Sequence, residues 1–416
     1  MTSPVWHPFT QHGLGEDIPL VARAEGAALY TADGRRYVDA ISSWWVTTHG
    51  HCNPRIMAAI REQTGQLDQL IFAGWTHEPA ETLARALVDI TPAALQHVFF
   101  SDSGSTSVEV ALKMALGYWL NRGEARHRIA VMEHSYHGDT IGAMSVGERG
   151  VYNRAYQPLL FDVDTIPFPK DDGEVAIAAL ERLCAQNPPA ALIVEPLILG
   201  AGGMLIYAPH VLKALRDICA REGVLFIADE VMTGWGRTGT LFACEQAGIA
   251  PDIMCLSKGL TGGAIPLAAT LATKEIFDAH VSDDRAKMFF HSSSYTANPI
   301  ACAAANGNLA IWRDEPVRKR ILNLSYRQAK RLNALDHPAI VNRRQLGTIT
   351  AMEFVDPYGD YLSAMAPVLG RFFRDRGLLL RPMGNTVYVM PPYCIDDADL
   401  DAIYEAIAAA AREVAA

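Results

Sequence analysis

The stretch that decides the fold is VLFIADEV at residues 224–231, followed by DIMCLSK at residues 252–258. Both segments are short and almost continuously apolar, a pattern typical of parallel strands whose two faces are covered by helices. The first run delivers Asp229 near its end and the second delivers Lys258. Because parallel strands present their carboxyl ends at one edge of a sheet, where ligands collect, we expect this acid and this amine to face one site.

Further apolar runs flank these two segments between residues 97 and 273: HVFFSDS, RIAVMEH, AALIVEP and PLAATLAT. Helical patterns lie between them, among them VEVALKMALGYWL and HVLKALRDICAREG. The second of these ends on Gly223, a residue type that favours the C-terminal end of a helix. The alternation predicts a large α/β domain over residues 56–310, built on a mostly parallel sheet.

The two ends of the chain have different patterns. Asp33-Gly34 separates two short β-type runs and predicts a hairpin in an N-terminal segment, residues 1–55, that joins the smaller domain. Residues 311–416 contain a long helical stretch, the strand patterns TITAMEFV and VYVMPP, and a closing Ala-rich helix. We therefore expect a smaller α+β domain at the C-terminus.

Composition excludes several classes of function. The chain has 416 residues, a formal net charge of -10 and a sequence pI near 5.7, which argues against nucleic-acid binding. No apolar stretch reaches the ~18 to 20 residues of a membrane span. Seven cysteines are scattered singly without a Cys-x-x-Cys pair, as in proteins with reduced thiols. The composition predicts a cytoplasmic protein that binds neither membranes nor nucleic acid.

The charged pair suits pyridoxal 5'-phosphate. The amine of Lys258 can hold the cofactor's aldehyde, and the carboxylate of Asp229 can keep its ring nitrogen protonated. The segment SDSGSTSVEV leads from a strand into a helix, so Gly104 and Ser105 stand where a phosphate binds, although such residues also serve as simple helix caps. Tyr136 follows another strand and can stack on a flat ring or pack in the core. Together these features predict one cofactor.

Two other site types fit less well. GWGRTG at residues 234–239 matches Gly-x-Gly-x-x-Gly, but a dinucleotide site requires an acidic residue at the end of the next strand, which here ends in Lys258. A nicotinamide-dependent dehydrogenase is therefore the distant alternative. His134 and His137 lack a third ligand cluster, so we expect no metal site. No Gly-x-Ser-x-Gly is present for a hydrolase.

The segments LFIADEVMTGWGRTG and PDIMCLSKGLTGG resemble the class III, or omega, aminotransferases, and the resemblance runs through nearly the whole chain. It implies pyridoxal phosphate, the fold type I of such transferases, and a homodimer with shared active sites. The segments WHPFT, ISSWWVTTHGH, FSDSGSTSVEVALKMAL, YHGDTIGAMS, GAGGM and RPMGNTVYVMPPY resemble the branch that converts 8-amino-7-oxononanoate to 7,8-diaminononanoate in biotin synthesis. S-adenosylmethionine is the expected donor and lysine the alternative. The nearest alternative function is a broad omega-aminotransferase, or another class III enzyme such as an aminomutase, acting on a different amine or ketone.

The resemblance also assigns residues. Lys258 is the catalytic residue, and Arg381 would receive the oxononanoate carboxylate, for which a planar guanidinium is suited. Cofactor binding is implied for Gly104, Ser105, Tyr136, Asp229, Lys258, Ser293 and Ser294, the last two reaching the phosphate of the neighbouring subunit. Substrate binding is implied for Trp44, Trp45, Tyr136, Arg237, Ser292 and Arg381.

Three positions depart from the family pattern. Ser294 stands where Thr is expected, which removes a small contact. Phe9 stands where Tyr is frequent, and Leu199 stands where Gln is common. We expect phosphate binding to survive the first change, whereas the other two concern the amino donor.

Overall fold

The computed structural model describes residues 3–356 and 361–414. Its centre is a seven-stranded sheet with the order β4-β12-β11-β10-β7-β5-β6. The strands are β4 (Leu95–Ser101), β5 (Ile129–Met132), β6 (Asp164–Ile166), β7 (Ala191–Val194), β10 (Leu225–Asp229), β11 (Ile253–Leu256) and β12 (Ala268–Thr273). Strands β6, β5, β7, β10 and β11 run parallel, and β12 is antiparallel to β11 and β4. Of these seven strands, only β6 was not predicted from the sequence, because three residues are too few to show a periodic pattern.

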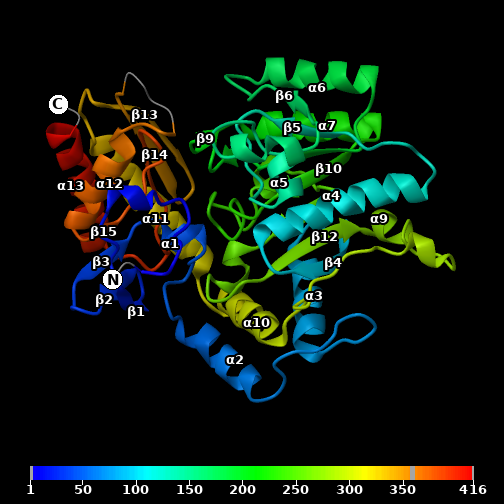
Figure 1. Ribbon diagram of the computed structural model, residues 1–416, viewed down its shortest axis with the longest axis horizontal. Coiled ribbons are helices and arrows are strands. Elements are labelled where there is room, and N and C mark those ends of the chain that lie inside the picture. Colours follow the sequence, from blue (N-terminus) through cyan, green and yellow to red (C-terminus); the bar gives the residue numbers. More distant parts are fainter. Residues whose placement is uncertain (1–2, 357–360, 415–416) are drawn as a thin grey trace.

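Helices cover both faces of this sheet (Figure 1). Neighbouring residues of β7 point to opposite faces: Leu192 packs in a cluster with α6 (Glu174–Gln186) and α7 (Pro209–Glu222), and Ile193 in one with α4 (Gly104–Asn121). This double burial explains the continuous apolar strands. No helix in the described residues is long and apolar enough to cross a lipid bilayer.

A four-stranded sheet joins the two ends of the chain. It contains β1 (Val21–Glu25), β2 (Ala28–Thr31), β3 (Arg36–Asp39) and β15 (Leu378–Leu379). The hairpin between β2 and β3 is confirmed, and Gly34 supplies the positive φ of 87° that its turn requires. Strand β15 pairs parallel with β3, so the blue N-terminal strands lie beside the orange and red C-terminal elements (Figure 1).

The C-terminal part adds a three-stranded sheet and several helices. The elements are α11 (Val317–Ala334), β13 (Ile340–Leu346), β14 (Ile349–Phe354), α12 (Met365–Asp375), β16 (Thr386–Val389) and α13 (Asp397–Glu413). The connecting helix α10 (Pro299–Asp314) runs continuously across residue 310, where we placed a domain boundary. The boundaries at residues 55 and 310 stay predictions.

Candidate active site

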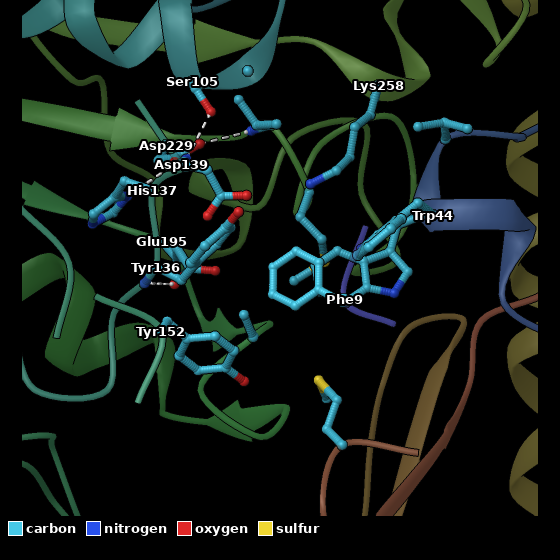
Figure 2. A pocket seen from close by; sticks show the side chains of 18 of the residues that line it. Phe9, Trp44, Ser105, Tyr136, His137, Asp139, Tyr152, Glu195, Asp229 and Lys258 are labelled. Atoms are coloured by element: carbon cyan, nitrogen blue, oxygen red, sulfur yellow. Dashed lines mark hydrogen bonds and ion pairs between the residues drawn. The ribbon is translucent and has the colours of Figure 1, made fainter. Parts of the chain in front are cut away.

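A cavity of about 360 Å³ lies at the carboxyl ends of β10 and β11. Asp229 and Lys258 both face it, as the positions of their strands predict (Figure 2). Its wall contains Pro8, Phe9, Trp44, Trp45, Val46, Gly104, Ser105, Tyr136, His137, Gly138, Asp139, Tyr152, Glu195, Ala201, Asp229, Val231, Met232, Lys258, Tyr361, Arg381 and Met383. The cavity therefore brings together residues from the whole length of the chain.

Lys258 projects into the cavity from the turn that follows β11. It begins the 3-10 turn η3 (Lys258–Thr261) with a φ of 45°, and its Nζ lies 4.9 Å from the ring centroid of Trp45. Burial lowers the pKa of the Lys258 amine, and the negative charge of Asp229 opposes that shift. A buried amine with a lowered pKa is more readily neutral, the state in which it can attack a carbonyl or accept a proton.

Asp229 is held by two contacts. Its Oδ2 lies 2.7 Å from His137 Nδ1, and its Oδ1 accepts a hydrogen bond of 3.1 Å from the backbone N–H of Val231. Both side chains are buried, and His137 Nε2 has no hydrogen-bond partner among the described residues. His137 is a functional neighbour that sequence reasoning missed, because it was considered only as a metal ligand. Its position directly after Tyr136 was the available signal.

Glu195 is a second residue that sequence reasoning missed. It follows β7, and its carboxylate accepts hydrogen bonds from the backbone N–H of Tyr136 at 3.0 Å and of Gly200 at 2.9 Å. Burial raises its pKa to about 7, partly opposed by His137. The signal was its place in AALIVEP, directly after a strand, as Asp229 directly ends the next strand in the sheet.

Helix α4 begins at the cavity with free backbone donors. Ser103 Oγ accepts from the N–H of Thr106 at 3.2 Å, and Thr106 Oγ1 accepts from the N–H of Ser103 at 2.9 Å. This capping box leaves the N–H groups of Gly104 and Ser105 without a partner among the described residues. Free N–H groups at the positive end of a helix form an anion site.

Close backbone approach shapes the same region. A Cβ at Gly138 would lie 2.1 Å from Ser105 Oγ, and one at Gly104 would lie 2.7 Å from Val231 Cγ1. The tight approach at Gly138, whose φ is 132°, lets the N–H of Asp139 donate to Ser105 Oγ at 3.1 Å. Glycine at these positions therefore narrows the anion site around α4.

The end of the cavity away from the strand tips is aromatic and cationic. The Arg381 guanidinium carbon lies 5.0 Å from the ring centroid of Trp44 and 5.4 Å from that of Phe9. Arg381 also donates to the hydroxyl of Tyr361 at 3.3 Å, whose ring centroid lies 4.4 Å from that of Tyr152. No carboxylate in residues 3–356 or 361–414 is within ion-pair distance of Arg381 (4.0 Å or less). Its charge is thus available to an anionic ligand.

The two tryptophans diverge from one short turn, α1 (Ser42–Trp45). Trp44 is 41% exposed and reaches the cavity, where its ring meets Phe9 edge-on at 5.6 Å (Figure 2). Trp45 is 5% exposed, and its Nε1 donates to the hydroxyl of Tyr388 at 3.0 Å. One tryptophan therefore lines the open end and the other packs beside Lys258.

Several predicted site residues do not line this cavity. Arg237 is buried behind it and donates to the backbone carbonyls of residues 45, 47 and 391, so its role toward substrate stays a prediction. Its segment GWGRTG forms a turn and opens no helix, unlike a dinucleotide site. Ser292, Ser293 and Ser294 lie in a loop outside the cavity, and their contact with another subunit stays a prediction. Leu199 is fully buried outside the lining.

The donor set fits pyridoxal phosphate. An anion site at α4, a carboxylate at Asp229, an amine at Lys258 and the flat ring of Tyr136 all face one cavity. These are the groups that a phosphate, a pyridine nitrogen, an aldehyde and an aromatic ring require.

Comparison with known proteins identifies a family of aminotransferases. Residues 13–411 match the family described as aminotransferase class III. A protein of Synechococcus elongatus named adenosylmethionine-8-amino-7-oxononanoate aminotransferase is 47% identical over 413 residues, which cover 97% of this chain and 97% of that protein. The chain belongs to the class III aminotransferases.

Solved structures agree with this class III aminotransferase over nearly its whole length. The adenosylmethionine-8-amino-7-oxononanoate aminotransferase of Methanocaldococcus jannaschii has a TM-score of 0.94 at 33% identity and covers 99% of this chain and 97% of its own. An amine transaminase from an uncultivated Pseudomonas species, solved with pyridoxal phosphate, has a TM-score of 0.90 at 31% identity and 99% coverage of both chains. The predicted α/β transferase fold, the cofactor pyridoxal phosphate and the aminotransferase activity are confirmed.

Proposed function

We propose that this enzyme transfers an amino group to 8-amino-7-oxononanoate, giving 7,8-diaminononanoate in biotin biosynthesis, with S-adenosylmethionine as the donor. Relatives whose names carry this activity support the proposal over nearly the full length of the chain. The structural observation that carries it is Arg381, a cation without an ion-pair partner among the described residues, which lies against the aromatic wall of the cavity that Lys258 also lines. That arrangement suits a long apolar substrate with a terminal carboxylate.

At the cofactor end we assign each group a role. The N–H groups of Gly104 and Ser105 would hold the phosphate, Tyr136 would cover the ring, Asp229 would meet the ring nitrogen, and Lys258 would hold the aldehyde. The chemistry that the cofactor supplies when bound is the reversible uptake of an amino group and the withdrawal of electrons into its ring. Every other step depends on residues of the chain.

Lys258 would move the proton in both half-reactions. With its amine free, neutral Nζ would take the proton from the donor carbon as a base and give up that proton again as an acid. The lowered pKa favours the neutral amine that the first transfer needs. The ring of Trp45, 4.9 Å from Nζ, would shield this position from water.

Asp229 and His137 would hold positive charge at the ring nitrogen. The carboxylate is buried, and its contact with His137 at 2.7 Å fixes its direction. A buried anion placed in this way stabilises a proton on a nearby nitrogen and needs no rearrangement during the reaction.

Arg381 would bind the carboxylate of the acceptor. Its guanidinium is positioned by the rings of Phe9 and Trp44 and by the hydroxyl of Tyr361. The planar fork of an arginine matches a carboxylate with two parallel hydrogen bonds. The apolar wall between Arg381 and Lys258 would then pack against the substrate's hydrocarbon chain.

Two departures from the family pattern, Phe9 and Leu199, concern the identity of the amino donor. Leu199 lies outside the cavity lining, so it does not contact a substrate directly. Phe9 does line the cavity and lacks the hydroxyl of tyrosine. The ring centroid of Tyr152 lies 6.2 Å from that of Phe9, so a phenol is still present at this wall.

We further propose a homodimer in the cytoplasm. The loop with Ser292, Ser293 and Ser294 is flanked by Phe290 and Tyr295, which are 62% and 63% exposed. A second subunit would cover these aromatic side chains and receive the serines near its phosphate. The seven cysteines are all free, which suits a reducing compartment.

The decisive experiment is the absorption spectrum of the purified enzyme loaded with pyridoxal phosphate. We expect S-adenosylmethionine to bleach the visible band and 8-amino-7-oxononanoate to restore it. Bleaching by lysine and not by S-adenosylmethionine would replace the donor only. A band that other amines bleach and that 8-amino-7-oxononanoate fails to restore would favour a broad omega-aminotransferase.

A further inference from the structure

The turn that carries the two tryptophans has an unfavourable backbone. Ser42, Ser43 and Trp45 have φ values of 53°, 58° and 67°. Residues with a Cβ rarely occupy this region, and they persist there only when their surroundings hold them. Three such residues within four positions therefore require a specific restraint.

Asp39, the last residue of β3, restrains the backbone N–H groups of this turn, while Arg237 binds the carbonyl of Trp45 and Ser42 Oγ donates to the carbonyl of Met390. Asp39 Oδ1 accepts from the N–H of Ile41 at 3.2 Å and of Ser43 at 2.8 Å, and its Oδ2 accepts from the N–H of Ser43 at 2.7 Å. His51 Nε2 lies 2.7 Å from the same Oδ2. Asp39 is fully buried, and a carboxylate tolerates that only when it is bonded in this way.

The restrained turn determines where both tryptophans point. Trp44 is directed to the open end of the cavity, beside Phe9 and Arg381, and Trp45 is directed to Lys258. Asp39 itself does not line the cavity. It can therefore act on the site only through the turn.

We propose that Asp39 is a positioning residue whose carboxylate holds the Ser42–Trp45 turn and thereby sets both ends of the cavity. Without the carboxylate the turn relaxes, Trp44 leaves Arg381, and water reaches Lys258 past Trp45. The role does not depend on which amine the enzyme uses, so it goes beyond the proposed substrate.

The first test is hydrogen exchange measured by mass spectrometry on the enzyme loaded with pyridoxal phosphate. Asp39→Asn keeps the shape of the side chain but removes its charge and turns an acceptor into a donor. We expect exchange in residues 40–48 to rise about tenfold while α13 is unchanged. Faster exchange throughout the chain, or none in residues 40–48, would overturn the proposal.

The second test is a double-mutant cycle with Trp44→Ala, using S-adenosylmethionine and 8-amino-7-oxononanoate at a temperature well below both melting points. Asp39→Asn should raise KM about tenfold in the wild-type background and about twofold at most when Trp44 is already absent. Equal effects in both backgrounds would contradict the part of the proposal in which Asp39 positions Trp44.

Matched variants keep both tests decisive. Asp33→Asn changes an exposed residue in the turn between β2 and β3. It should change neither hydrogen exchange in residues 40–48 nor KM. If Asp39→Asn does not fold, His51→Ala removes one partner of the same carboxylate and should give the same pattern at about threefold. A wild-type enzyme inactive on 8-amino-7-oxononanoate would reject the proposed substrate, whereas the exchange test would still judge Asp39.

Discussion

The two ends of the cavity are built in different ways. At the cofactor end, Asp229 and Lys258 come from the tips of adjacent strands of one sheet, 29 residues apart; Asp229 is buried and Lys258 is partly buried. At the substrate end, Phe9, Trp44 and Arg381 come from opposite ends of the chain, and the two aromatic rings are 47% and 41% exposed. The comparison teaches that the shared chemistry sits on rigid, locally encoded elements, and specificity on peripheral segments that can vary.

The largest effect should follow loss of the amine at the cofactor end. Lys258→Ala should lower kcat by at least about 10⁴-fold, because none of the other described residues that line the cavity carries an amine that could take over its covalent role. Steady-state kinetics and the visible spectrum check this result. Lys319→Ala, on the exposed face of α11, is the control and should remain fully active. Substantial turnover by the first variant would reject the assigned role.

The next largest effect concerns stability at the same end. Burial raises the pKa of Glu195 from 4.5 to about 7, so the folded protein binds a proton more tightly than the unfolded chain. Protonation of Glu195 therefore adds to the free energy of unfolding. This stabilisation is fully present below pH 4.5 and is lost as the pH rises through about 7, and it amounts to about 3 kcal/mol or less. The wild type should therefore lose more stability between pH 5 and pH 8 than Glu195→Gln does.

Urea unfolding of the cofactor-free proteins at a series of pH values measures that difference. The bound cofactor is left out because its own ionisation adds to the pH dependence. Glu405→Gln, an exposed residue of α13, should follow the wild-type curve. Parallel curves for wild type and Glu195→Gln would show that burial of this carboxyl does not govern stability.

At the substrate end the expected effects are smaller and depend on the substrate. Arg381→Lys should raise KM for 8-amino-7-oxononanoate about 10- to 100-fold, since an ammonium lacks the two-pronged geometry of a guanidinium. With the acceptor's carboxylate converted to an amide, wild type and variant should differ little. Arg371→Lys, exposed on α12, is the matched control. An equal loss with both substrates would remove Arg381 from carboxylate recognition.

The smallest effect should come from a residue that supports this arginine. Tyr361→Phe removes the hydroxyl that accepts from Arg381 at 3.3 Å, and KM should rise about threefold with kcat unchanged. The exposed Tyr326→Phe should leave both constants unchanged. A fall in kcat without a change in KM would mean that Tyr361 acts at the cofactor end, and the two ends would then not differ in the way described.

The same contrast explains what could be predicted from the sequence. Asp229 and Lys258 were predictable because a residue at the end of an apolar strand has a known position in a parallel sheet. His137 and Glu195 were missed because their place in the site depends on which strand ends become neighbours. No local sequence pattern specifies the order of strands in a sheet. Tyr361 gives no signal at all, because only the folded chain brings it to Arg381.

The strand pairing at the two ends of the chain was predictable only in part, for a physical reason. The hairpin at residues 33–34 follows from local turn chemistry, so it was predictable. The parallel pairing of β3 with β15 joins residues more than 300 positions apart, and a two-residue strand has no recognisable period. Helix α10 runs continuously across residue 310, so the change in apolar pattern near that residue does not mark the end of an element.

The pairing of β3 with β15 sets an order of events during protein synthesis. A ribosome adds about 5–20 residues per second, so the strand preceding Trp44 waits on the order of tens of seconds for its partner. The sheet around Lys258 needs no residue beyond 273 and can form while translation continues. Premature termination before residue 378 would therefore leave one edge of β3 unpaired just before the tryptophan turn, where a chaperone or protease can recognise it.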